Sequence, residues 1–199
     1  MKTTESQSRG PFWALLALTG LPFMLALYFF YNPDMLTGLT TANKGQLLTP
    51  ARQVPQMTLQ TLDGKGFDTS ALKESWALLL VSPSACDTEC EKNLFLLRQI
   101  RLAMGENRKR IHRLMLLTDT NNLDQLKQQL EPYEGTRVIT GSPDDRQQLL
   151  SLLETGDLPP NGRIFTIDPQ GKIILAYDLD PNWKDILKDL EHLLKVVQL

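Results

Sequence analysis

The sequence predicts an α/β domain that follows a single N-terminal membrane-spanning helix. Three observations support this: an uncharged apolar run near the N-terminus, short continuously apolar segments typical of buried strands, and amphipathic segments between them. The chain has 199 residues, 42% hydrophobic and 22% charged, with a formal net charge of −2. This length suits one domain with a short appendage, and the near-neutral charge argues against a nucleic-acid partner.

The apolar run PFWALLALTGLPFMLALYFFY, residues 11–31, contains no charged side chain. A helix of this length spans roughly 30 Å, the hydrocarbon thickness of a bilayer. Gly20 and Pro22 are tolerated in membrane helices. A cleaved signal sequence is the alternative, but its apolar core is usually about 7–15 residues long. We therefore expect an uncleaved transmembrane anchor over residues 11–31.

The charges around the span predict its orientation. Lys2 and Arg9 precede it, whereas the next basic residue after it is Lys44. The positive-inside rule then makes residues 1–10 a cytoplasmic tail. The N-terminus also lacks the Arg-rich, amphipathic character of a mitochondrial import sequence. We expect a single-pass protein of the bacterial inner (plasma) membrane with a periplasmic C-terminal domain.

The chain after the span is interpreted as a linker over residues 32–55 and a folded domain over residues 56–199. The linker mixes Gly, Pro, Thr and Asn without sustained periodicity. The domain begins with alternating apolar and polar residues over 56–64, which predict a half-buried strand or hairpin arm closed by Asp63-Gly64.

The rest of the domain alternates strands and helices. WALLLVS is continuously apolar, as expected of a strand buried on both faces. Helices are predicted from apolar residues at helical spacing, from a stop at Gly105, and from the Ser142-Pro143 start of a later helix. The expected elements are a strand over 76–82, a helix ending at 105, a strand over 113–119, a helix over 122–130, a strand over 136–140, a helix from 143, a hairpin over 163–177 and a helix over 182–197.

This element order is that of a thioredoxin-like α/β domain. The crossover from Trp76 to Asp119 has to be parallel and right-handed. Cys86 then lies just beyond the carboxyl end of a central strand, at the beginning of a helix. Open α/β sheets place their active sites at this edge.

The segment SACDTEC holds both cysteines of the chain, Cys86 and Cys90. Their i, i+4 spacing at a helix start puts both sulfurs on one side, where the helix N-terminus favours thiolate over thiol. Thiolates are the nucleophiles of disulfide exchange and soft ligands that select Cu(I). The pair is therefore a candidate redox pair or metal site. A structural disulfide is the alternative, although so short a loop removes little unfolded-state entropy.

The two histidines are the candidate third ligands for a metal. His112 begins the second parallel strand, roughly 20 Å from the cysteines, so we expect it at the surface or at the strand entry rather than in the site. His192 shares one side of the last helix with Asp185 and Asp189, away from the apolar stripe, and we expect it to be solvated.

The apolar span, CDTEC at a strand-to-helix turn, MLLTDT in the second strand and IFTIDPQGKI in the hairpin together resemble the Sco/SenC (PrrC) family. The resemblance covers roughly residues 55–197. It implies a membrane-anchored, thioredoxin-like protein that handles copper for cytochrome c oxidase assembly. Cys86 and Cys90 match the copper-binding, redox-active cysteines of that family.

The chain departs from the family at the third copper ligand, a histidine shortly before the hairpin. Pro159, Pro160 and Asn161 occupy that region here, where a cis-proline-like loop is an alternative. The chain thus resembles a divergent member without the distal histidine. The resemblance implies thiol–disulfide oxidoreductase activity, Cu(I) handling, or both, through Cys86 and Cys90. The alternative is a non-catalytic, membrane-tethered module that binds oxidase subunits or other assembly factors.

Overall fold

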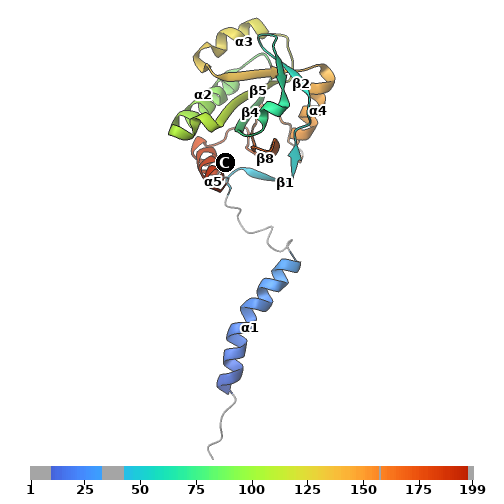
Figure 1. The fold of residues 1–199 in the computed structure, drawn as a ribbon. Coiled ribbons are helices and arrows are strands. Elements are labelled where there is room, and N and C mark those ends of the chain that lie inside the picture. The colour runs from blue at the N-terminus through green and yellow to red at the C-terminus, as the bar shows by residue number, and fades with distance from the viewer. Residues whose placement is uncertain (1–9, 33–42, 157, 197–199) are drawn as a thin grey trace, which may run out of the picture. The chain divides into compact units, whose positions relative to one another are not determined.

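The computed structural model describes residues 10–32, 43–156 and 158–196 (Figure 1). The chain divides into two units between residues 42 and 43. The predicted cytoplasmic tail, apart from Gly10, lies outside the described residues, as do residues 33–42 of the predicted linker.

The N-terminal unit contains helix α1 (Gly10–Tyr31), in agreement with the helix expected over residues 11–31. Its segment Phe12–Tyr31 has a mean hydropathy of 1.9, so it is long and apolar enough to cross a membrane. Pro22 lies inside the helix, and the Thr19 hydroxyl donates to the Leu15 carbonyl at 2.9 Å. Such bonds keep hydroxyl groups satisfied within an apolar solvent.

The second unit is built on one mixed sheet of eight strands in the order β1-β8-β7-β4-β5-β6-β2-β3. The central β4, β5 and β6 are parallel, and the outer strands are antiparallel. The strands are β1 (Gln46–Gln53), β2 (Thr58–Thr61), β3 (Gly66–Asp68), β4 (Trp76–Ser82), β5 (Ile111–Leu117), β6 (Thr136–Thr140), β7 (Ile164–Ile167) and β8 (Lys172–Ala176).

Helices cover both faces of this sheet (Figure 1). The α-helices are α2 (Thr88–Ala103), α3 (Leu123–Leu130), α4 (Pro143–Leu153) and α5 (Trp183–Val196), with short 3-10 helices η2 (Thr69–Leu72), η3 (Gly105–Arg110) and η4 (Glu131–Tyr133). Ser142 caps α4 in a reciprocal capping box with Asp145, as its sequence predicts.

Strand β4 is apolar throughout because both of its faces are buried. Trp76, Leu78 and Leu80 pack beneath α2, α3 and α5, whereas the alternate residues pack into a second core on the α4 side. All seven residues of the strand are buried. Burying one leucine contributes about 1.5–3 kcal/mol, so the strand that precedes the Cys86 loop is firmly packed.

The predicted crossovers and the predicted hairpin are confirmed. β4 and β5 pair in parallel through α2, with Ser82 opposite Leu117, and β5 and β6 pair in parallel through α3. β7 and β8 form the antiparallel hairpin, whose turn is closed by the Gly171 N–H donating to the Asp168 carbonyl at 2.9 Å. Cys86 therefore follows the carboxyl end of a central strand.

The linker predicted over residues 32–55 is too long at its C-terminal end, because Gln46–Gln53 form strand β1 at the sheet edge. Most residues of β1 are exposed, and Pro50 interrupts its pattern, so the sequence carries no strand period. Pairing with β8, whose residues provide that period, determines this element.

A buried carboxylate holds the beginning of this unit. Asp189 of α5 is 2% exposed and accepts from the N–H groups of Lys44 and Gly45, each at 2.8 Å, and from the Tyr177 hydroxyl at 3.1 Å. A Cβ on Gly45 would lie 2.6 Å from the Tyr177 ring, so this close approach requires glycine. Asp189 is therefore covered rather than solvated. His192, on the same side of α5, is exposed as expected.

Candidate redox and metal site

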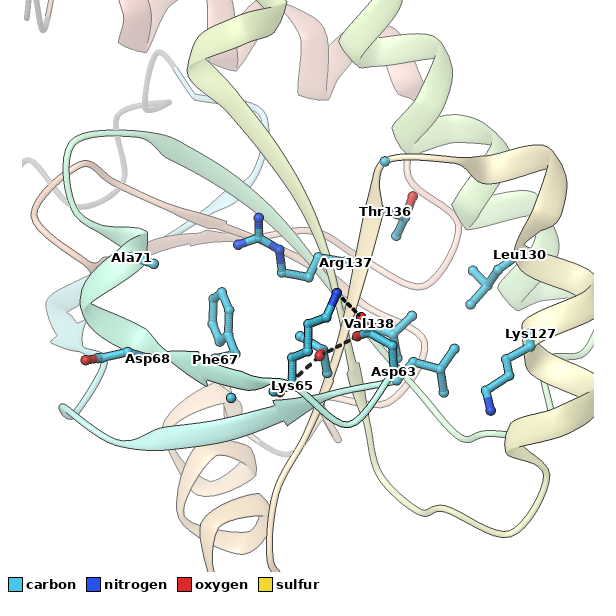
Figure 2. Close-up of a pocket in the computed structure, with 14 residues that line it drawn as sticks. Asp63, Lys65, Phe67, Asp68, Ala71, Lys127, Leu130, Thr136, Arg137 and Val138 are labelled. Carbon is cyan, nitrogen blue, oxygen red and sulfur yellow. Dashed lines mark hydrogen bonds and ion pairs between the residues drawn. The ribbon is translucent and has the colours of Figure 1, made fainter.

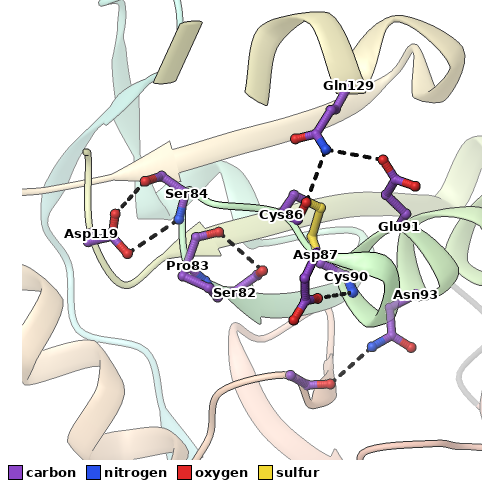
Figure 3. The surroundings of a disulfide bond; sticks show 11 residues. Ser82, Pro83, Ser84, Cys86, Asp87, Cys90, Glu91, Asn93, Asp119 and Gln129 are labelled. Carbon is purple, nitrogen blue, oxygen red and sulfur yellow. Dashed lines mark hydrogen bonds between the residues drawn. A yellow bond between two sulfur atoms is a disulfide. The ribbon is translucent and has the colours of Figure 1, made fainter. Parts of the chain in front are cut away.

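The two predicted site residues are brought together as a disulfide between Cys86 and Cys90, with Cα atoms 5.2 Å apart (Figure 3). Cys86 lies in the loop after β4, and Cys90 lies in the first turn of α2. Their residues are 6% and 5% exposed, so the bond lies just beneath the surface.

The beginning of α2 lies between the two cysteines. Asp87 has an extended backbone, and its carboxylate accepts from the Cys90 N–H at 2.9 Å. The Glu91 N–H donates to the Asp87 carbonyl at 2.9 Å and begins the helical ladder. This N-cap supplies a partner for one of the free amide groups at the helix start and so holds Cys90 in place.

A second set of hydrogen bonds joins the loop after β4 to the loop after β5. The Ser84 hydroxyl is buried and donates to the Asp119 carboxylate, and it accepts from the Asn122 N–H at 2.9 Å. The Asn121 N–H donates to Asp119 at 3.1 Å. The hydrogen bond from Ser84 is the main cause that lowers the pKa of Asp119, so the carboxylate stays ionised and keeps these donors.

Two amide side chains enclose the disulfide (Figure 3). Gln129 of α3 donates to the Cys86 carbonyl at 3.0 Å and to the Glu91 carboxylate at 3.1 Å. Asn93, 2% exposed, donates to the Gly162 carbonyl at 3.1 Å, which joins α2 to the loop before β7. Neither amide was identified from the sequence, because a contact between α2 and α3 or between α2 and this loop leaves no local pattern.

Opposing charges act on the sulfurs. The N-terminal dipole of α2 favours a Cys86 thiolate, whereas the carboxylates of Asp87, Glu89 and Glu91 at the same helix start disfavour it. The nearby cation Lys92 pairs with Asp180 at 2.6 Å rather than with a sulfur. The site is thus less electropositive than its helix N-terminus alone predicts.

The other residues weighed from the sequence lie where expected, with one correction. His112 pairs opposite Ala77, roughly 17 Å along β4 from Ser82 and far from the disulfide. Among the described residues, the cis peptide bond precedes Pro50, so Pro159 and Pro160 follow trans bonds. The region before the hairpin therefore does not form the cis-proline-like loop considered from the sequence.

The donor set fits a two-sulfur site. In the described part of the chain, no group of three or more His, Cys, Asp or Glu side chains converges in a geometry that could hold a metal ion. Reduction of the disulfide would supply two soft thiolates one helical turn apart, which suit Cu(I). The side chains present therefore fit a bis-thiolate ligand set and do not complete it with a histidine.

The fold and this geometry agree with known proteins. A family model described as "transmembrane-like, thioredoxin-like, C-terminal domain" matches residues 76–197. The chain belongs to this family. A search of curated protein sequences finds no significant match.

Solved structures extend the comparison of this thioredoxin-like domain. Bradyrhizobium japonicum ScoI with copper bound has 17% identity and a TM-score of 0.57, covering 70% of this chain and 98% of that one. BsSco, from a study of its disulfide switch, has 18% identity and a TM-score of 0.58, covering 74% and 95%.

A third similar structure is the thioredoxin domain of a Bacteroides vulgatus thiol–disulfide oxidoreductase, with 19% identity, a TM-score of 0.54 and coverage of 77% and 99%. These neighbours confirm the predicted thioredoxin-like fold and the likeness to Sco/SenC proteins. At such identities they show the fold alone.

Proposed function

We propose that this chain is a membrane-anchored, Sco-like protein that assists cytochrome c oxidase assembly by thiol–disulfide exchange at Cys86 and Cys90. The observation that carries the proposal is the Cys86–Cys90 disulfide at the carboxyl end of β4 and the start of α2. BsSco, which has the same fold, is described by its disulfide switch and as a member of a family of cytochrome c oxidase assembly proteins.

The exchange takes two balanced steps. In the reduced protein the Cys86 thiolate attacks one sulfur of a partner disulfide, which forms a mixed disulfide and releases one partner thiolate. The Cys90 thiolate then attacks the Cys86 sulfur, releases the second partner thiolate and forms the intramolecular disulfide. Two electrons pass to the partner, and the disulfide form described here is the oxidised product.

Cys86 is assigned as the attacking residue because it precedes the α2 N-cap, whereas Cys90 is held inside the first turn. A residue in the loop can approach a partner without unwinding the helix. Gln129 holds the Cys86 carbonyl from α3 and so fixes the backbone of the attacking residue. The N-cap keeps Cys90 within reach of the mixed disulfide.

We further propose Cu(I) as cargo of the reduced pair. Both Cys86 and Cys90 then act as thiolate ligands, and the disulfide and the copper-loaded form are mutually exclusive states of the site. The copper-bound ScoI structure shows that a protein of this fold carries the metal. In this chain, reduction by two electrons has to precede loading.

The proposed location follows from α1. Lys2 and Arg9 before the helix favour a cytoplasmic N-terminus, and this supports a periplasmic location of the thioredoxin-like domain in a bacterium. Disulfides persist in that compartment, and a membrane anchor keeps the domain near a membrane-embedded oxidase subunit or another assembly factor.

A redox titration of the full chain in detergent, with and without Cu(I), tests the proposal. We expect a reversible two-electron midpoint between about −300 and −120 mV, where exchanging disulfides lie. Structural disulfides have midpoints below about −300 mV. Cu(I) should raise the midpoint, since it binds the dithiol alone. A midpoint below about −300 mV, together with no copper uptake by the reduced protein, would overturn both roles. The Cys86→Ser, Cys90→Ser double variant is the control for uptake.

One observation favours the second candidate, a non-catalytic binding module. An apolar groove of about 500 Å³ lies between α2 and the start of α5, where Phe95 and Trp183 are 52% and 43% exposed. Exposed apolar surface of this kind marks protein interaction sites. If oxidase assembly survives the double cysteine variant and fails in Trp183→Ala, the chain acts by binding alone.

A further inference from the structure

Strand β6 has a partly free edge. β2 pairs with it at two positions, Gln60↔Thr140 and Thr61↔Ile139, and then turns away into the β2–β3 hairpin. The pairing with β2 ends at Ile139, so residues 136–138 are paired with β5 on one side and have no strand partner on the other among the described residues. An unpaired strand edge offers N–H and C=O groups with which another strand can pair.

A cavity of about 840 Å³ lies along this edge (Figure 2). Thr136 and Leu130 stand on one side of β6, and Arg137 and Phe67 stand on the other, so the cavity extends over both sides of the strand edge. Its walls combine apolar side chains with charged side chains of both signs. A volume of this size at an open strand edge suits an extended peptide better than a simple ion.

Charged side chains of both signs line the cavity, namely Lys65, Lys127, Arg137, Asp63 and Asp68. Lys65 pairs with Asp63 at 3.0 Å and Lys127 pairs with Asp124 at 3.6 Å, whereas Asp68 accepts from the Ser70 N–H at 2.8 Å. Arg137 lies over the Phe67 ring, 5.3 Å from its centroid, and has no carboxylate partner in the described part of the chain. Among the described residues, Arg137 is therefore the cation of the lining that is open to a carboxylate of a ligand.

A buried guanidinium reinforces that charge. Arg113 is 4% exposed and donates through Nη2 to the Glu134 carbonyl, but its Nε and Nη1 atoms have no partner among the described residues. Burial is the main cause that lowers the pKa of Arg113, and the nearby cations Arg101 and Arg98 lower it further. A desolvated charge without a counter-ion is costly, so a nearby anionic group would be attracted to it.

Arg113 lies directly behind the cavity wall. Gly135 lines the cavity, and a Cβ added to it would lie 3.0 Å from Nη2 of Arg113. Gly135 has φ +85°, a conformation that suits glycine, so the wall stays thin at this point. The adjacent Thr136 also lines the cavity, and its buried Oγ1 has no hydrogen-bond partner among the described residues.

We propose that this cavity binds an extended, acidic segment of a partner protein, which adds as a strand to the free edge of β6. The backbone of residues 136–138 pairs with the segment, Arg137 contacts its carboxylates, and Arg113 attracts them through the wall at Gly135. Arg113 pairs opposite Thr136, so the site lies at the amino ends of β5 and β6. Cys86 lies at the other end of the parallel strands, beyond their carboxyl ends. It does not depend on the redox proposal.

The test uses the full chain in detergent and a fluorescein-labelled peptide in which Glu and Val alternate. We expect saturable binding by fluorescence anisotropy, and slower amide hydrogen exchange of residues 136–138 when the peptide is bound. A version with Lys in place of Glu should bind at least about tenfold more weakly, since like charges face each other. A version with alternate N-methylated amides should also fail, because it cannot pair as a strand.

Variants separate the site from general charge attraction. Arg137→Glu should weaken binding at least about tenfold, whereas Lys172→Glu makes the same charge change at exposed β8 and should leave binding within about twofold. Arg113→Met removes the buried charge and keeps the bulk of the side chain. It should weaken binding while leaving the thermal midpoint of the peptide-free chain unchanged or higher, because two unpaired donors are lost.

Three results would overturn the proposal. Equal binding of the Glu and N-methylated peptides would show that the peptide does not pair with β6 as a strand. Competition by inorganic phosphate would show that the cavity binds a small anion and not a peptide. Preferential binding to phosphatidylglycerol vesicles would show that it binds a lipid surface. A large fall in the thermal midpoint of Arg113→Met, with peptide affinity unchanged, would make Arg113 a structural residue.

Discussion

The two edges of the central parallel strands differ in how their polar groups are satisfied. At the carboxyl edge, beside Cys86, Ser84 and Asp119 hold each other and neighbouring backbone amides, and Asp87 caps α2. At the amino edge, Arg113 leaves two buried nitrogens without partners in the described part of the chain.

This difference agrees with the two sites that we propose. A disulfide that is repeatedly opened and closed needs a backbone that stays in place while the covalent bond changes, and the hydrogen bonds of Ser84, Asp87 and Gln129 provide that support. A docking site keeps its polar groups unpaired until a ligand arrives, which costs stability in the free protein. Substitutions at the carboxyl edge test this contrast.

The largest effect is expected from the cysteines themselves. Cys86→Ser with Cys90→Ser should abolish the two-electron redox couple and Cu(I) uptake, because no other thiol is present in the chain. Cys90→Ser alone should accumulate a mixed disulfide on Cys86, seen as a shifted band on a non-reducing gel. Mixed disulfide in Cys86→Ser but not in Cys90→Ser would reverse the assigned roles.

Ser84→Ala should destabilise the domain next most strongly. It leaves the Asn122 N–H without its acceptor and removes the hydroxyl donor of Asp119, which keeps the Ser84 and Asn121 N–H groups, at a cost of about 1–3 kcal/mol. Urea unfolding of the full chain measures the change. Ser151→Ala is the matched control, since its hydroxyl donates to the Gln148 carbonyl on an exposed helix face. Equal midpoints for the two variants would show that the Ser84 network does not support the loop.

Substitutions of Asp87 separate capping from charge. Asp87→Ala should cost about 1 kcal/mol of unfolding free energy through the lost N-cap, whereas Asp87→Asn keeps a capping oxygen and should cost less. Asp87→Asn should also lower the thiol pKa of reduced Cys86, because one nearby carboxylate is neutralised. The pH dependence of alkylation by iodoacetamide measures this, and an unchanged profile would contradict the electrostatic role.

A smaller effect concerns pH. Asp119 has a pKa lowered from its ordinary value of 3.8 mainly by the Ser84 hydrogen bond, so its contribution to stability is present above pH 3.8 and is lost as pH falls through the lowered value. Ser84→Ala should therefore lose less stability than the parent chain as the pH falls below 3.8. An identical acid dependence of the two midpoints would show that Asp119 is not the titrating group.

Much of this protein follows from local pattern. WALLLVS predicts β4 at its observed bounds, TRVIT predicts β6, and the Ser142-Pro143 signal predicts the start of α4. The cysteine pair is found because two cysteines at i, i+4 spacing directly after a buried strand indicate thiol chemistry at a helix start. Each of these signals is carried by residues that are adjacent in the chain or one helical turn apart.

The features that the sequence does not reveal depend on residues far apart in the chain. β1 exists because β8 pairs with it and because Asp189 holds Lys44 and Gly45, which are more than 140 positions away. The Ser84–Asp119 pair and the position of Arg113 behind Gly135 require the folded sheet. Periodicity and capping act over one or two turns of chain, so they predict the elements and Cys86 with Cys90. Burial and hydrogen bonding between distant segments then determine which polar groups are satisfied and which remain open to a partner.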